Sequence, residues 1–60
     1  MNLKKLFIKN LVIENINNNI LLTGKDYEKF TNITKKRGLI ADETDFNAYM
    51  AFQYELKNNN

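Results

Sequence analysis

The sequence predicts a small α+β fold in which an N-terminal β-hairpin is followed by two helices. Three observations lead to this prediction. Strand-forming residues cluster near the N-terminus, a threonine cap precedes an amphipathic segment, and acids open an aromatic-rich segment. Sixty residues make one single domain. We expect the hairpin over residues 1–23, helices over 24–38 and 43–57, and a frayed tail at 58–60.

The N-terminal segment fits more than one structure. Residues 6–14 are rich in β-branched and aromatic side chains, which favour a strand. Helical spacing also fits in part, because four apolar residues fall near one helical face: Leu6, Ile13, Ile16 and Ile20. The asparagine-rich run 15–19 favours the hairpin, since asparagine tolerates left-handed backbone angles and bonds to its own backbone. A second strand is then expected over residues 19–22.

The segment 24–38 predicts an amphipathic helix. We expect the Thr23 side chain to accept a hydrogen bond from the amide of Asp26, as in a capping box. Residues at spacings of three and four predict its inner face, which comprises Tyr27, Phe30, Ile33 and Thr34. Gly38 is expected to end the helix, because glycine readily takes the left-handed conformation at this position.

The last helix, 43–57, has a wide apolar surface. At about 100° per residue, its large side chains cover an arc of about 200°, twice the stripe with which a surface helix packs on its core. One interpretation is that the hairpin and the first helix both cover it. The other is that part of the arc is left for a protein partner, since tyrosine suits interfaces. The second interpretation predicts partner contacts by Tyr49, Phe52 and Tyr54.

A second candidate surface is the charged junction between the helices, which reads "KKRGLIADETD". Lys35, Lys36 and Arg37 fall in the last turn of one helix, where cations favour the negative end of the helix dipole. Three acids fall at the start of the next helix, where the dipole is positive. The pattern first indicates a junction between two helices. It also holds three cations on one exposed corner, which predicts a contact there with an acidic or nucleic-acid partner.

The composition argues against several kinds of chemistry. The chain contains no histidine and no cysteine, so the usual metal ligands and the usual general base near neutral pH are absent. It also has no glycine-rich phosphate loop. We therefore expect no catalytic residues, no cofactor and no metal, and predict a protein that is not an enzyme. No apolar run approaches the ~20 residues of a membrane span, so we expect a cytoplasmic protein without a membrane partner.

Part of the chain resembles a known family. Over residues 18–56, the pieces "ILLTGKDYEKF", "KKRGL" and "DETDFNAYM" are similar to the ribbon-helix-helix family of DNA-binding repressors. In that family, a dimer places a two-stranded ribbon in the major groove. The resemblance implies that Asn19, Leu21 and Thr23 would meet the DNA and that the last helix would form the dimer interface.

Three classes of function follow from these observations. We prefer an interaction protein that binds a protein or a protein–nucleic acid complex and inhibits or modulates it. Such a protein would be similar in kind to small phage-encoded inhibitors, including anti-CRISPR proteins. The first alternative is the dimeric DNA-binding repressor implied by the resemblance. The second is a structural subunit whose exposed aromatic residues make contacts in a homodimer or larger homo-oligomer.

Overall fold

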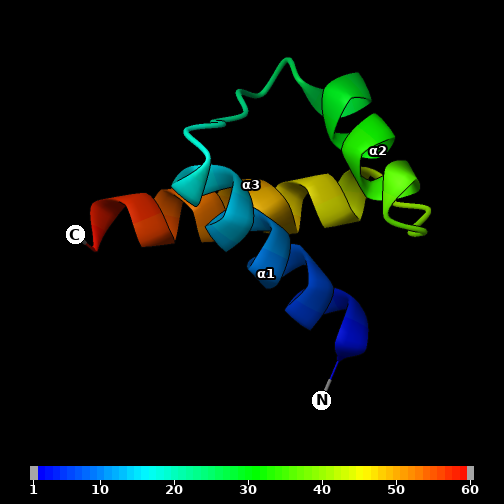
Figure 1. Ribbon diagram of the computed structural model, residues 1–60, viewed down its shortest axis with the longest axis horizontal. Helices are drawn as coiled ribbons and strands as arrows, with labels where there is room; N and C mark the ends of the chain where they lie inside the picture. Colours follow the sequence, from blue (N-terminus) through cyan, green and yellow to red (C-terminus); the bar gives the residue numbers. More distant parts are fainter. Residues whose placement is uncertain (1, 60) are drawn as a thin grey trace.

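The computed structural model describes residues 2–59, and it contains three helices (Figure 1). They are α1 over Leu3–Asn17, α2 over Tyr27–Lys36 and α3 over Glu43–Asn58. No strand occurs between residues 2 and 59. The predicted α+β fold is therefore wrong, and so is the hairpin over residues 1–23, because most of that segment is helix α1.

Helix α1 forms where the hairpin was expected because its start is capped and one of its faces is buried. The Asn2 side chain accepts hydrogen bonds from the amides of Lys4 and Lys5, at 3.0 and 3.3 Å. One face carries the buried residues Ile8, Leu11, Val12 and Asn15. Other apolar residues of α1 are exposed on the opposite side, and together the two sets hide the helical period in the sequence.

The asparagine-rich run ends helix α1 and makes no hairpin turn. Asn19 takes a left-handed φ of 61° directly after the helix. Its amide donates to the carbonyl of Ile16 at 3.0 Å, and the amide of Ile20 donates to the carbonyl of Asn15 at 2.7 Å. These two bonds form a Schellman motif. Asparagine thus adopts a left-handed angle in this run, but the predicted hairpin turn is wrong, because the angle ends a helix.

An extended segment connects α1 to α2, and it is held to α3. Leu22 is buried in this segment, and its backbone pairs with the side-chain amide of Gln53. The predicted bond from the amide of Asp26 to the Thr23 side chain does not form. The Asp26 carboxylate accepts from the Thr23 amide at 2.7 Å, while the Thr23 hydroxyl accepts from the Lys25 amide at 3.3 Å. Helix α2 therefore begins at Tyr27, three residues later than expected.

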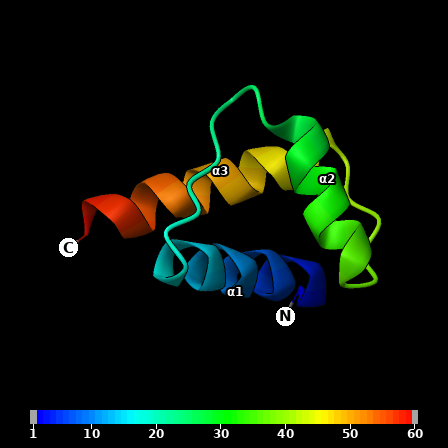
Figure 2. The same cartoon turned by 45° about the horizontal axis from the view of Figure 1, so that its top comes forward.

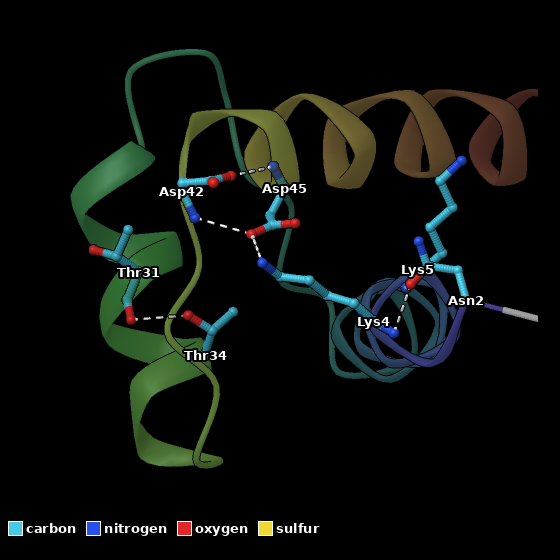
Figure 3. Close-up of polar contacts among 7 residues, drawn as sticks. All are labelled: Asn2, Lys4, Lys5, Thr31, Thr34, Asp42 and Asp45. Carbon is cyan, nitrogen blue, oxygen red and sulfur yellow. Dashed lines mark hydrogen bonds and ion pairs between the residues drawn. The ribbon is translucent and has the colours of Figure 1, made fainter.

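Helix α2 packs on α3 and ends in a second Schellman motif. Phe30 and Thr34 are fully buried, and the Thr34 hydroxyl donates to the carbonyl of Thr31 (Figure 3). After the helix, Gly38 has a left-handed φ of 85°. Its amide donates to the carbonyl of Lys35, and the next amide, of Leu39, donates to the carbonyl of Thr34, both at 3.0 Å. Gly38 thus ends α2 as the sequence predicted.

Helix α3 begins with a capping box formed by two acids. The amide of Asp45 donates to the Asp42 carboxylate at 3.1 Å, and the amide of Asp42 donates to the Asp45 carboxylate at 3.0 Å (Figure 3). The helix continues to Asn58, the first residue of the expected tail, and Asn59 is its C-cap. Residue 60 lies outside the described residues.

Helices α1 and α3 cross and run in the same direction, while α2 lies across the N-terminal end of α3 (Figures 1 and 2). An aromatic cluster fills the place where α2 meets α3. The ring centroid of Phe30 lies 5.3 Å from that of Phe46 and 5.4 Å from that of Tyr49. Such separations are typical of favourable aromatic pairs. The C-terminal half of α3 extends away from α2 in both views.

Candidate interaction surfaces

Tyr49 lies in the core. Its side chain is fully buried, and its hydroxyl accepts a hydrogen bond from Asn15 Nδ2 at 2.8 Å. Burial raises the pKa of Tyr49, and the bond from Asn15 offsets part of that rise. Tyr49 is therefore a core residue, and its side chain is not available for the predicted contact with a partner.

The two other predicted aromatic residues of α3 differ in exposure. Phe52 is half-buried and packs against the core. Tyr54 is 72% exposed and is the one residue of the predicted trio that stands in solvent. The wide apolar arc is therefore covered by α1, α2 and the connecting segment, apart from the edge that carries Tyr54. Tyr54 belongs to the C-terminal half of α3, which runs away from α2 (Figure 2).

The predicted cationic corner is divided by the fold. Arg37 pairs with Glu14 of α1, so it ties the C-terminal end of α2 to α1. Lys35 and Lys36 are exposed. Adjacent helical residues point about 100° apart, so these two lysines face different directions. Lys36 and Arg37 line one groove together with Glu14, whereas Lys35 is not part of it, so the three cations do not form one patch.

A different set of cations shares one face of α2. Lys29 and Lys36 lie seven residues apart on one side of α2, and Lys25 lies in the turn just before the helix. All three are exposed and line one shallow groove of about 500 Å³, together with Asn32, Ile33 and two acids, Asp26 and Glu28. We call Lys25, Lys29 and Lys36 the α2 cationic face. Sequence reasoning included only Lys36, although the spacing of Lys25 and Lys29 on the predicted helix was a usable signal.

The acids near this face are few and partly engaged. From Lys25 to Arg37 the chain carries five cations and two acids, Asp26 and Glu28. The Asp26 carboxylate accepts from the Thr23 amide, and this bond holds the pKa of Asp26 below its ordinary value. Asp26 is therefore ionised at neutral pH, but it is turned towards its own backbone. The surplus of positive charge remains on the lysines.

The acids that open α3 lie on another part of the molecule. Asp45 is buried, and its carboxylate pairs with the Lys4 ammonium at 2.8 Å (Figure 3). Burial alone would raise the pKa of Asp45, but hydrogen bonds from Lys4 and from the Asp42 amide outweigh it, so that pKa is lowered. The same carboxylate raises the pKa of Lys4. This pair fastens the start of α1 to the start of α3.

The three residues that the family resemblance assigns to DNA lie around the connection between α1 and α2. Asn19 is the left-handed residue that ends α1, and its side chain is exposed. Leu21 is 47% exposed, and Thr23 forms the turn with Asp26. None of the three lies in a strand. Leu21 and Thr23 lie in the connecting segment and Asn19 in the turn before it, and the Asn19 and Thr23 backbones already serve local hydrogen bonds.

Residues 2–59 contain no cluster of carboxylates of the kind that holds a metal ion. In the same part of the chain, no helix has the length and apolar character needed to cross a membrane. The grooves at the surface are shallow and lined by mixed polar and apolar side chains. Comparison with protein-family models, curated proteins and solved structures finds no match to this chain.

Proposed function

We propose that this chain is a small non-enzymatic interaction protein that inhibits or modulates a macromolecular partner. It binds an acidic surface of that partner through the α2 cationic face. The observation that carries the proposal is the groove shared by Lys25, Lys29 and Lys36, in which three exposed cations lie beside the amide of Asn32. The proposal places the protein in the cytoplasm, where protein and nucleic-acid partners of this charge are abundant.

The chemistry of the groove supports an acidic ligand. Exposed lysines steer acidic partners to a surface and raise the association rate, an effect that weakens as salt is added. The Asn32 amide can donate hydrogen bonds to carboxylate or phosphate oxygens. Ile33, at the base of the groove, is half-buried and offers a small apolar contact. Such a site suits binding without chemical change of the ligand.

Polyanion titrations test this proposal. Fluorescence anisotropy would follow binding of duplex DNA, single-stranded RNA and a glutamate-rich peptide at about 50 and 200 mM salt. Lys29→Glu combined with Lys36→Glu should weaken binding of the preferred probe by at least about tenfold. The matched control, Lys5→Glu with Lys57→Glu, makes the same change of net charge on other surfaces and should bind nearly as the wild type does. No binding of any probe at low salt contradicts the proposal.

DNA binding by the connection between α1 and α2 is the second candidate. It is favoured by the exposure of Asn19, Leu21 and Thr23, which lie close together in the sequence between the two helices. Asn19→Gly with Thr23→Val tests it, because glycine keeps the left-handed backbone and valine keeps the shape of threonine. Loss of duplex binding in this variant, with binding retained in the Lys29→Glu/Lys36→Glu variant, would select the DNA candidate over the α2 cationic face.

A further inference from the structure

Helix α1 has a second apolar face that its own chain leaves uncovered. Within residues 2–59, six large apolar side chains are exposed, and three of them lie on α1. These are Leu3, Leu6 and Ile13, at 74%, 42% and 41% exposure. Scattered exposed apolar residues are ordinary, but a line of them along one helix indicates a contact surface.

The exposed residues of α1 follow the spacing of a coiled-coil seam. Steps of three, four, three and four residues lead along the helix through Leu3, Leu6, Asn10, Ile13 and Asn17. We call these five residues the α1 seam; all are exposed. At about 100° per residue, the α1 seam lies opposite the buried face of Ile8, Leu11 and Val12. It therefore points away from the core along the whole helix.

The charges beside the α1 seam are complementary to a second copy in parallel orientation. In a parallel helix pair, a residue flanking the seam faces the residue five positions later on the other helix. Lys9 therefore meets Glu14 of the second copy, and the symmetry of the pair repeats this contact. An antiparallel pair centred on Asn10 would instead bring the two Lys9 side chains together. Lys9 is exposed, and Glu14 pairs with Arg37 within the described residues.

Asn10, in the middle of the α1 seam, also favours a parallel pair. The α1 seam carries two asparagines, of which Asn17 lies at its end. An asparagine flanked on both sides by apolar seam residues pairs with its counterpart in a parallel dimer and fixes both register and number of helices. Asn10 occupies that place, between Leu6 and Ile13. At the C-terminal end of the seam, a small groove of about 160 Å³ is lined by Ile13, Ile16, Asn17 and Leu56, so apolar surface continues there onto α3.

We propose that two copies of this chain form a parallel dimer through the α1 seam, with Asn10 against Asn10 and Lys9 against Glu14. The seam spans two heptads, fewer than a free coiled coil needs, but α1 is already held as a helix by the core. Association therefore does not have to order the helix. The contact is small, so the dissociation constant is expected on the order of 10–100 μM. The dimer leaves the α2 cationic face free.

Sedimentation equilibrium from about 5 to about 500 μM tests the dimer. The apparent mass of the wild type should rise from that of one chain towards that of two. Leu6→Lys with Ile13→Lys should stay monomeric throughout, with an unchanged helical circular-dichroism spectrum. The control Ile40→Lys changes a side chain that is 78% exposed outside α1 and should dimerise as the wild type does. A monomeric wild type, or equal dimerisation of the double variant, overturns the proposal. Binding of that monomer to lipid vesicles would assign the seam to a membrane surface instead.

A cysteine cross-link tests the orientation. The chain has no cysteine, so Leu3→Cys introduces the one thiol. In the parallel dimer the two Cys side chains are adjacent and should form a disulfide under mild oxidation. In an antiparallel dimer centred on Asn10 they would lie about 20 Å apart, too far for a bridge. Dimerisation without cross-linking overturns the parallel register.

Discussion

The side-chain amide of Gln53 pairs in both directions with the backbone of Leu22. Gln53 Nε2 donates to the Leu22 carbonyl at 2.8 Å, and Gln53 Oε1 accepts from the Leu22 amide at 3.1 Å. Leu22 is buried but lies outside every helix, so its backbone has no helical partner. One glutamine of α3 thus supplies the hydrogen bonds that a neighbouring strand would otherwise provide, and it holds the connection between α1 and α2 in place.

We expect Gln53→Ala to destabilise the protein by about 2–4 kcal/mol, since two buried backbone groups lose their partners. The whole domain is expected to have a free energy of unfolding of only roughly 3–9 kcal/mol, so the loss would be large. Urea titration followed by circular dichroism measures it. Glu55→Ala, an exposed change on the same helix, serves as the control and should stay within about 0.5 kcal/mol of the wild type. A similar midpoint for both variants would contradict the role given to Gln53.

The sequence predicts the second and third helices because their signals are local. The spacing of Phe30 and Thr34 identifies the buried face of α2, and Gly38 marks its end. The acids at the start of α3 are a capping signal that depends on neighbours three residues apart. Each signal is contained within one turn of the chain, so no knowledge of the tertiary structure is needed to read it.

The first helix is not predicted from the sequence because its apolar residues lie on two opposite faces. Ile8 and Val12 face the core, whereas Leu6 and Ile13 face solvent, so no single helical stripe is visible in the sequence. The burial of Asn15 depends on its hydrogen bond to Tyr49, which lies 34 residues away in the sequence. An asparagine that is buried through a distant hydroxyl looks the same in the sequence as one in a turn. The exposure of Tyr54 and the burial of Tyr49 likewise follow from where α1 crosses α3.

The Asn15–Tyr49 hydrogen bond provides a second test of the core. Tyr49→Phe keeps the ring but removes the acceptor of Asn15 Nδ2, and we expect a loss of about 1–3 kcal/mol. Combining it with Asn15→Ala should cost less than the sum of the two single changes, because the partners act together. Thermal unfolding of the four proteins gives the coupling energy. Strict additivity would show that the two side chains do not interact.

The two glycines should respond oppositely to alanine. Gly38 has a left-handed φ of 85°, and a Cβ there would meet no atom within 4 Å, so the cost of Gly38→Ala is conformational alone. We expect a destabilisation of about 1–2 kcal/mol. Gly24 also has open space around it but no left-handed φ, so Gly24→Ala should stabilise the protein by about 0.4–1 kcal/mol through the unfolded chain. A melting temperature that does not fall for Gly38→Ala would contradict the Schellman assignment at Gly38, and one that falls for Gly24→Ala would contradict the prediction for Gly24.

The Lys4–Asp45 pair predicts how stability changes with pH. The pKa of Asp45 is lower in the folded protein than in the unfolded chain. The stability that ionised Asp45 adds is therefore fully present above about pH 3.9, and it is lost as pH falls through the pKa of the folded state. The pKa of Lys4 is raised in the folded protein. The stability that protonated Lys4 adds is therefore fully present below about pH 10.4, and it is lost as pH rises through the pKa of the folded state. Near neutral pH both contributions are complete.

Asp45→Asn isolates the acidic limb of this dependence, because asparagine keeps a side-chain oxygen for the Asp42 amide but carries no charge for Lys4. Wild type should be more stable than Asp45→Asn at pH 7, and the difference should shrink as pH falls from about 5 to about 2. Urea midpoints at each pH measure it. Asp26 also has a lowered pKa, but it titrates in both proteins and cancels in the comparison. A difference that stays constant over this range would show that the folded protein does not lower the pKa of Asp45.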